Sequence, residues 1–597
     1  MAQSVFHLFR TNVDSTPSKV AALVKRDGAY REVTWKTMGD EADRVSRSLL
    51  GLGVKAGDRV NIICTTSYEW CMIDMGILGA GCVTVPIYTS LLPDECQYIV
   101  DNSGSVVVFA ENAEQVEKFR TEKGRMPNVK KVIQIFGPVS SDDGWVISYD
   151  DFLKLAKNDQ ATLDGCRQAL NGESILTIIY TSGTTGRPKG VVLTHDCMVY
   201  EAEAVAEMKI VQSNDIQLFW LPLAHSFAKV LEIAWIGTGH VMAFAVAMET
   251  IKENLPETRP TLMAGVPRLF EKFHAAVVNK GTAPGGLKAK LFTAAAELSK
   301  KNGDLESQGR ALDFADSVKF GILKKLVFKK VGKGLAELMG GRLRFLISGG
   351  APLSPQIAYF FRDAGITVLE GYGLTETSAA TFVNRPGRNR IGTVGPAFPG
   401  TEVKIAEDGE ILIKGRGVMT GYWNNKEATL EVFKDGWFCT GDIGTVNSDG
   451  TLKITDRKKD IIVTAGGKNI APQNLENMLK THRLISQVVV HGDKRKFLSA
   501  VITLDPDALK AYCDSNTLGN GSYAEMTQKP EVEKAIQQAV DEFNNGLAKY
   551  ETIKKFKILE HDFTIESGEL TPSVKVKRKV VNERYKEIFD GFYQEKY

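Results

Sequence analysis

The stretch YTSGTTGRPKG, residues 180–190, stands between the apolar runs ILTIIY and VVLTH, which predict two strands. Six of its first seven residues are small, hydroxylated or glycine. Glycine permits close backbone approach and positive φ, and converging N–H and hydroxyl groups suit an anionic oxygen. Lys189 adds a positive charge that can reach a phosphate. The stretch therefore predicts a phosphate-binding loop, with a polar surface turn as the alternative.

The loop does not match the common P-loop pattern G-x-x-x-x-G-K-[ST]. Counted from Gly183, the sixth position is Pro188, and Lys189 is followed by Gly190 rather than by a hydroxylated residue. The mismatch argues against the kinase and GTPase readings. The remaining motifs must show which phosphate the loop would hold.

The bulk composition is that of a globular enzyme with more than one domain. The chain has 597 residues, beyond the ~250–300 at which a single core stops growing. Its net charge of +2 gives no reason to expect a nucleic-acid partner. The longest apolar run, LEIAWIGTGHVMAFAVAM, contains Glu232 and His240, so we interpret it as core rather than a membrane span.

Helical and strand patterns alternate through most of the chain, which predicts an α/β fold with parallel sheets covered on both faces. After about Gly392, alternating strands with Asp-Gly turns predict hairpins of a β-rich subdomain. The charged sequence DRKKD then precedes a segment of mixed α and β character that ends in a predicted helix. We expect a large N-terminal domain over 1–455, a hinge at 456–460 and a small α+β C-terminal domain over 461–597.

A second motif, GYGLTET, occupies residues 371–377 and follows the strand and glycine turn of LISGGAPLSP. Tyr372 offers a flat face suited to stacking on a base, and Thr375 can donate to a phosphate. Glu376 is a hard oxygen ligand of the kind that Mg²⁺ prefers. The alternative is an ordinary turn before a helix.

Further short motifs lie before and after GYGLTET along the chain. The sequence WFCTGDIG contains Asp442, whose carboxylate could accept hydrogen bonds from a diol, and TDRKKD contains Arg457. LPLAHSF contains His225, and ESGELTPSVKVKRKVV contains Lys575. Taken singly, each of these residues could be a structural or solvated side chain.

Together and in this order, the motifs resemble those of the adenylate-forming superfamily, which includes acyl-CoA synthetases, luciferases and adenylation domains of peptide synthetases. Val574 stands where the shorter-chain form of the last motif, SGK, has glycine, so the chain looks like the long-chain fatty acid–CoA ligase branch. The resemblance implies that the C-terminal domain rotates about the hinge. It also implies ATP and Mg²⁺ as cofactors and coenzyme A as co-substrate.

The resemblance assigns a role to each matching position. Lys575, His225, Thr375 and Glu376 are the implied catalytic residues, and Glu376 and Thr184 the implied metal ligands. The implied nucleotide and coenzyme A positions are Thr181, Ser182, Gly183, Thr184, Thr185, Gly186, Lys189, Gly349, Gly350, Ala351, Glu370, Gly371, Tyr372, Gly373, Asp442, Arg457, Gly466, Gly467 and Lys468.

The implied reaction joins a fatty acid, expected to be long-chain, to AMP and then transfers the acyl group to coenzyme A. AMP and pyrophosphate are the other products. Three alternatives stay open: a ligase that loads a carrier protein, a luciferase-like oxidation, and a nucleotide-binding regulator without catalysis.

The segment FGILKKLVFKKVGKGL, residues 320–335, interleaves lysines with apolar residues. It could contact an anionic membrane, or it could be a core-facing helix with a basic solvent face. We expect a cytoplasmic protein with peripheral contact at the inner membrane face. The sequence leaves the oligomeric state open.

Overall fold

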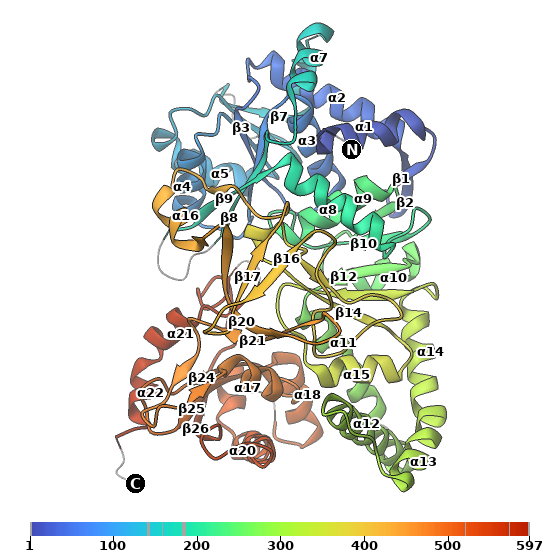
Figure 1. Cartoon of the computed structure of the whole chain (residues 1–597), viewed down its shortest axis with the longest axis vertical. Coiled ribbons are helices and arrows are strands. Elements are labelled where there is room, and N and C mark those ends of the chain that lie inside the picture. The colour runs from blue at the N-terminus through green and yellow to red at the C-terminus, as the bar shows by residue number, and fades with distance from the viewer. Residues whose placement is uncertain are drawn as a thin grey trace.

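The computed structural model describes residues 3–139, 144–157, 159–181, 187–283, 285–519, 521–571 and 574–594. Within them, two large sheets form the N-terminal part, a third sheet lies beside them, and a small α+β domain follows (Figure 1). This arrangement confirms the fold class predicted from the sequence.

The first large sheet contains the strands on either side of residues 182–186. Its eight strands, in spatial order, are β18 (Gly421–Tyr422), β9 (Lys189–Thr194), β8 (Ile175–Thr181), β4 (Val83–Ile87), β3 (Arg59–Ile63), β5 (Val107–Ala110), β6 (Lys131–Gln134) and β7 (Val146–Ser148). Strands β8, β4, β3, β5, β6 and β7 run parallel, whereas β9 and β18 are added antiparallel at one edge. The parallel prediction is therefore correct for the centre and wrong for this edge.

The second large sheet has the same mixed character. Its eight strands are β15 (Phe382–Val383), β14 (Val368–Tyr372), β13 (Phe345–Ser348), β12 (Leu262–Gly265), β10 (Ile216–Phe219), β11 (Val241–Phe244), β1 (Val20–Arg26) and β2 (Ala29–Thr34). Only β2 and β15, at the two edges, pair antiparallel. The run predicted to be core rather than membrane lies here, in β11 and in helix α9 (Ser226–Thr238).

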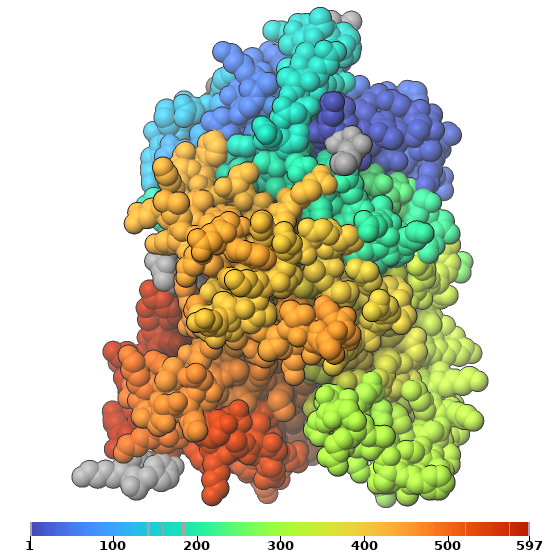
Figure 2. Space-filling model, in the orientation of Figure 1, coloured from blue at the N-terminus to red at the C-terminus, as the bar shows by residue number. Residues whose placement is uncertain are grey.

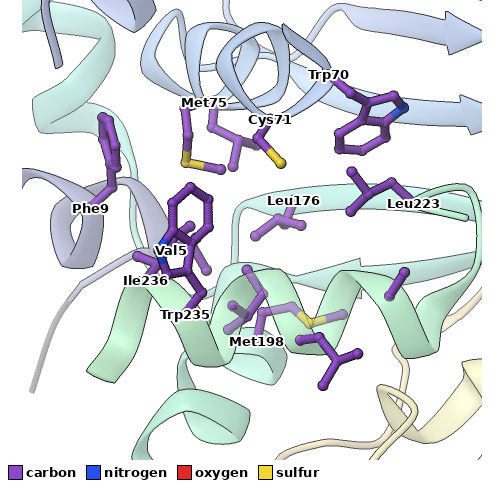
Figure 3. Close-up of a cluster of buried hydrophobic side chains, with 14 of the residues drawn as sticks. Val5, Phe9, Trp70, Cys71, Met75, Leu176, Met198, Leu223, Trp235 and Ile236 are labelled. Atoms are coloured by element: carbon purple, nitrogen blue, oxygen red, sulfur yellow. The ribbon is translucent and has the colours of Figure 1, made fainter. Parts of the chain in front are cut away.

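Helices cover both large sheets, and their apolar side chains form three separate buried clusters with the strands. The helices include α1 (Val5–Ser15), α2 (Trp35–Gly51), α3 (Tyr68–Gly79), α4 (Pro93–Ser103), α5 (Ala113–Thr121), α8 (His195–Met208), α9, α10 (Ile251–Thr258), α11 (Pro267–Thr282), α12 (Gly286–Ser307) and α15 (Pro355–Asp363). In the largest of these clusters, Trp235 of α9 packs among Val5 of α1, Met198 of α8 and Ile236 (Figure 3). Among the described residues, no helix has the length and apolar character needed to cross a membrane.

The third sheet is the β-rich subdomain that the Asp-Gly turns predict. It contains β16 (Glu402–Ile405), β17 (Glu410–Lys414), β20 (Trp437–Val446), β19 (Phe433–Lys434) and β21 (Leu452–Arg457). Strands β16 and β17 pair antiparallel, as do β20 and β21. The second of these pairs leads directly to the C-terminal domain.

The C-terminal domain packs against the rest of the chain (Figure 2). It contains β22 (Ile462–Val463), β23 (Asn469–Ile470), β24 (Ile485–His491), β25 (Leu498–Leu504), β26 (Ile553–Ile558), α17 (Pro472–Leu479), α18 (Pro506–Ser515) and α20 (Pro530–Asn544). Its two apolar clusters contain only residues after 460. Arg268 at the start of α11 reaches Asp505 at 2.9 Å, which ties the domains together.

The predicted terminal helix is shorter than expected and divided in two. Helix α21 (Arg578–Arg584) and helix α22 (Lys586–Gly591) are separated at Tyr585. The preceding residues are not helical because Leu570 and Val576 form an antiparallel bridge. Lys575 therefore lies in an extended turn before α21.

A buried group of charged side chains connects helix α9 to helix α3. Lys229 Nζ lies 2.5 Å from Asp74 Oδ2 on α3 and 2.9 Å from Glu232 Oε2 on α9. The lysine side chain is 2% exposed and both carboxylates are fully buried. The pKa of Glu232 is raised to about 7, because burial raises it by more than the charge of Lys229 lowers it. The Lys229 ammonium group is thus the counter-charge of both buried carboxylates.

Replacing Lys229→Met should destabilise the protein by about 3–5 kcal/mol, because it leaves buried carboxylates without a counter-charge. The melting temperature measured by calorimetry checks this. Lys36→Met is the matched control, since Lys36 and Asp40 form an ion pair with both side chains about two-thirds exposed, 67% and 66%. A melting temperature for Lys229→Met as close to wild type as that of the control would contradict the assignment.

Candidate active site

The nucleotide motifs of the second sheet meet at one edge because their strands run parallel. Gly349, Gly350 and Ala351 follow β13, and Gly371–Gly373 end and follow β14. His225 follows β10 and caps α9. In parallel α/β sheets, ligands bind outside the carboxyl ends of the strands. The fold therefore assembles at one place three motifs that lie between residues 225 and 373 of the chain.

Two of these glycines suit a close approach to a ligand or to protein. Gly350 has a φ of +82°, in the left-handed region that favours glycine. A Cβ on Gly349 would lie 3.0 Å from the ring of Phe227. The turn after β13 thus lies tightly against the first turn of α9.

The glycine-rich stretch connects β8 to β9. Thr181 and Lys189 are direct partners across this antiparallel pair, so the loop leaves and returns at the same point. Ser182, Gly183, Thr184, Thr185 and Gly186 lie outside the described residues. The ammonium group of Lys189 lies 5.1 Å from the centre of the Tyr422 ring.

Tyr422 is a site residue that sequence reasoning missed. It lies on β18, which pairs with β9, and its hydroxyl donates a hydrogen bond of 2.8 Å to Glu376 Oε1. Its ring faces Lys189, so one side chain contacts both the glycine-rich stretch and the second motif. The local sequence around Tyr422 is the dipeptide Gly421–Tyr422 in a short strand. It matches no motif with recognisable chemistry, so the sequence offers no reason to select Tyr422.

Asp442 and Arg457 are direct partners on β20 and β21. The Asp442 carboxylate accepts a hydrogen bond of 2.6 Å from the Tyr372 hydroxyl, and Arg457 Nε lies 3.1 Å from its other oxygen. Burial raises the pKa of Tyr372, and Asp442 raises it further, so this hydroxyl stays a donor. The predicted ribose and base residues are thus linked by direct hydrogen bonds.

His225 is held in one orientation and kept uncharged. Its Nδ1 accepts a hydrogen bond of 3.0 Å from the Phe227 N–H. Burial, with a smaller contribution from the charge of Lys575, lowers the pKa of His225 to about 3. Because Nδ1 is an acceptor, the proton of the neutral ring is assigned to Nε2. Beside it, the hydroxyls of Ser226 and Thr375 lie 3.1 Å apart.

Glu370 has an unsatisfied carboxyl oxygen. It is 8% exposed, and its Oε1 has no hydrogen-bond partner among the described residues. Burial raises the pKa of Glu370 to about 7. The side chain precedes Gly371 and lines the same cavity as the motif residues.

Lys575 reaches the site from the C-terminal domain. Its backbone N–H donates to Thr571 Oγ1 at 3.0 Å and its carbonyl accepts from the Thr571 N–H at 2.7 Å. Burial and then the charge of Arg457 lower the pKa of Lys575 to about 8, against the opposing effects of Asp442 and Glu376. Val574 has a φ of +60°, an uncommon value for a β-branched residue, at the position where the SGK form has glycine.

One cavity of about 3170 Å³ joins these groups between the domains. The predicted residues that line it are Thr181, Lys189, His225, Gly349, Gly350, Ala351, Glu370, Gly371, Tyr372, Gly373, Thr375, Glu376, Asp442, Arg457 and Lys575. Gly466, Gly467 and Lys468 do not line it; they form the exposed tip between β22 and β23. Lys468 Nζ lies 5.7 Å from the Tyr550 ring instead.

The cavity residues fit Mg²⁺ only as a partner of bound phosphate. Among the described residues, no group of three or more His, Cys, Asp or Glu could hold a metal. Glu376 has one carboxylate oxygen bound by Tyr422, and no described residue bonds the other. Mg²⁺ commonly takes one or two carboxylates together with substrate phosphates and water, which this arrangement allows.

Comparison with known proteins agrees with this geometry. The sequence model of the AMP-binding enzyme family matches residues 9–423, and that of the AMP-binding enzyme C-terminal domain matches residues 459–597. The chain is 38% identical over 571 residues to the long-chain-fatty-acid–CoA ligase FadD15 of Mycobacterium tuberculosis, covering 95% of this chain and 93% of the relative. It is 32% identical over 607 residues to the peroxisomal long chain acyl-CoA synthetase 6 of Arabidopsis thaliana, covering 96% and 83%.

Solved structures share the fold. The anthranilate CoA ligase AuaEII, in complex with anthranoyl-AMP, superposes with a TM-score of 0.74 at 21% identity and covers 99% of each chain. The A domain of carboxylic acid reductase from Segniliparus rugosus, in complex with AMP and a carboxylic acid, gives 0.74 at 20% identity and covers 99% and 94%. The family matches span both parts of the chain that line the cavity, and the chain belongs to the AMP-binding enzyme family.

Proposed function

We propose that the protein is an ATP-dependent long-chain fatty acid–CoA ligase. It would form acyl-AMP and pyrophosphate from a fatty acid and ATP, and then acyl-CoA and AMP. The observation that carries the proposal is that one cavity joins the nucleotide motifs, Lys575 and an apolar wall. The names of the relatives, a long-chain-fatty-acid–CoA ligase and a long chain acyl-CoA synthetase, support the substrate class.

The apolar wall is suited to an acyl chain. It is formed by the side of α9 opposite the buried charges and by neighbouring residues: Val205, Ile210, Val211, Val230, Leu231 and Ala234. Each methylene removed from water contributes about 0.8 kcal/mol to binding. Affinity should therefore rise with chain length until the cavity is filled.

In the first half-reaction, the fatty acid carboxylate is already ionised at neutral pH and acts as the nucleophile. An oxygen of the carboxylate bonds to the α-phosphorus as the bond to the pyrophosphate oxygen breaks. Lys189 and Lys575 would offset the charge of the phosphates, and neutral His225 would donate from Nε2 to an oxygen anion. Thr375 would hold the α-phosphate, and the stretch 181–189 the departing pyrophosphate.

Glu376 and Thr184 are the proposed ligands of Mg²⁺. When bound, the ion would neutralise phosphate charge and orient the triphosphate. Tyr422 holds one oxygen of Glu376 by a hydrogen bond of 2.8 Å and so fixes the direction of the other. We therefore propose Tyr422 as the residue that positions the metal-binding carboxylate.

In the second half-reaction, the coenzyme A thiolate would attack the acyl carbonyl and AMP would leave. We propose that the C-terminal domain over 461–597 rotates about the hinge 456–460 for this step, as a domain-scale gate. Rotation would withdraw Lys575 and bring in Gly466, Gly467 and Lys468, which lie at an exposed tip in the arrangement described above. Lys458 in the hinge forms ion pairs with Asp408 and Glu410. These contacts would hold the hinge to the β-rich subdomain while the C-terminal domain rotates.

We place the protein in the cytoplasm, with peripheral contact at the inner membrane face through residues 320–335. The proposed small-molecule partners are the fatty acid, ATP and coenzyme A. No nucleic-acid partner is proposed.

The proposed function is tested by AMP release from ATP with coenzyme A and short-, medium- and long-chain fatty acids. We expect strict dependence on coenzyme A and a kcat/KM that rises by up to about fourfold per methylene, because each is worth about 0.8 kcal/mol. A free carrier protein in place of coenzyme A is the control acceptor. Faster turnover with the carrier, oxygen consumption, or no release of AMP with any fatty acid would contradict the proposal.

Tyr422→Phe removes the hydrogen bond to Glu376 while keeping the ring beneath Lys189. We expect the Mg²⁺ concentration needed for ATP binding to rise by about tenfold, since residues that orient a metal ligand typically have effects of this size. Calorimetric titration of ATP at several Mg²⁺ concentrations checks this.

The matched control is Tyr200→Phe, which removes a hydroxyl that lies 2.6 Å from the Thr401 hydroxyl, away from the cavity lining. If the Mg²⁺ dependence of Tyr422→Phe equals that of Tyr200→Phe, the positioning role is wrong.

A further inference from the structure

A long helix at the periphery of the molecule has an unusual outer face. Helix α13 (Phe314–Leu323), the π-helical turn η2 (Lys324–Phe328) and helix α14 (Lys329–Leu338) run without a break along one outer edge of the molecule (Figure 1). Its inner side packs on the domain through buried residues. Phe328, for example, contacts Phe360 of α15 with ring centres 5.3 Å apart. The helix is therefore packed against the domain on its inner side only.

The outer side carries a row of large apolar residues. Phe314 is 86% exposed, Val318 49%, Ile322 54% and Leu326 51%. Successive members are four residues apart, a spacing that keeps side chains on one side of a helix. Scattered exposed apolar residues are ordinary, but a continuous row of four marks an interaction surface.

Lysines outnumber acidic residues along this row: Asp313 and Asp316 flank Phe314, and Asp316 pairs with Lys301 at 2.5 Å. Residues 317–336 contain six lysines and no aspartate or glutamate. Lys319, Lys325, Lys329, Lys330 and Lys333 are exposed. Lys324 differs, because its ammonium group lies 2.8 Å from the buried carboxylate of Asp363 and so belongs to the fold. The outer face thus combines apolar side chains with a strong positive charge.

We infer that this outer face, Phe314–Lys333, docks on the surface of an anionic lipid bilayer. The apolar row would enter the boundary between headgroups and acyl chains, and the lysines would contact anionic headgroups. A second copy of the chain fits less well, since a symmetric contact would bring two lysine rows together. The sequence alone pointed to residues 320–335. The structure moves the surface toward Phe314 and removes Lys324 from it.

The location has a consequence that rests on the proposed function. Long-chain fatty acids partition into membranes, so docking would hold the enzyme where its substrate is concentrated. Binding to lipid itself needs neither ATP nor a fatty acid. It can therefore be measured without substrates, and its failure is distinguishable from failure of the proposed activity.

The test is co-sedimentation of the full chain with phosphatidylcholine vesicles, with and without phosphatidylglycerol. Wild type should bind the anionic vesicles and bind neutral vesicles at least about tenfold more weakly, because the lysines supply attraction only to anionic lipid. Two variants address the two parts of the face: Lys325→Glu with Lys329→Glu and Lys330→Glu, and Phe314→Ser with Ile322→Ser. Each should lose at least about tenfold in apparent affinity for anionic vesicles.

The charge-matched control is Lys534→Glu with Lys549→Glu and Lys554→Glu, three exposed lysines of the C-terminal domain. It changes the net charge by the same amount and should bind nearly as wild type does. Melting temperatures and AMP release with a short, water-soluble fatty acid should be unchanged in the variants of the face. Absence of wild-type binding to anionic vesicles, or equal losses in the control and in the lysine variant, would overturn the inference.

Discussion

The site depends on holding positive charges from two domains around one cavity. Arg457 ends the β-rich subdomain and Lys575 comes from the C-terminal domain, and their like charges oppose one another. Burial, followed by this opposition, lowers the pKa of Lys575 to about 8, although Asp442 and Glu376 act in the other direction. The repulsion between these positive charges is offset when a polyanion binds between them. The charges around the cavity therefore suit the proposed triphosphate.

The same constraint explains the uncharged residues beside the cations. His225 has a pKa lowered to about 3, so it adds a hydrogen-bond donor without adding another charge. Helix α9, which carries His225, is anchored from behind by Lys229 and its two carboxylates. Its other side forms part of the apolar wall. One helix thereby connects the fixed core, the proposed acyl site and the reacting groups.

Much of the site was predictable because its residues lie in short motifs with their own chemistry. The prediction placed Lys189, Glu376, Asp442 and Lys575 in one site, and all four line one cavity. The sequence showed that Val574 replaces a glycine of the related motif, but its positive φ was not predicted. Parallel strands at the centre of both sheets followed from the alternating pattern, as did the hairpins after Gly392.

Other features required the fold itself. Tyr422 becomes a site residue only because β18 pairs with β9, and nothing in its local sequence signals that pairing. The buried group around Lys229 joins residues 155 positions apart. The exposed apolar row on α13 and η2 resembles a core pattern in sequence, and only burial distinguishes the two sides. The proposed roles of Gly466, Gly467 and Lys468 depend on a domain orientation other than the one described.

The central claim is that Lys575 completes the adenylate-forming site from the second domain and is dispensable once acyl-AMP exists. The most direct measurement compares both half-reactions in Lys575→Ala. Fatty-acid-dependent ATP–pyrophosphate exchange should fall by about 10²–10³-fold, as expected when a transition-state charge partner is removed. Thioester formation from supplied acyl-AMP and coenzyme A should remain near wild type. Equal losses in the two half-reactions would contradict the account.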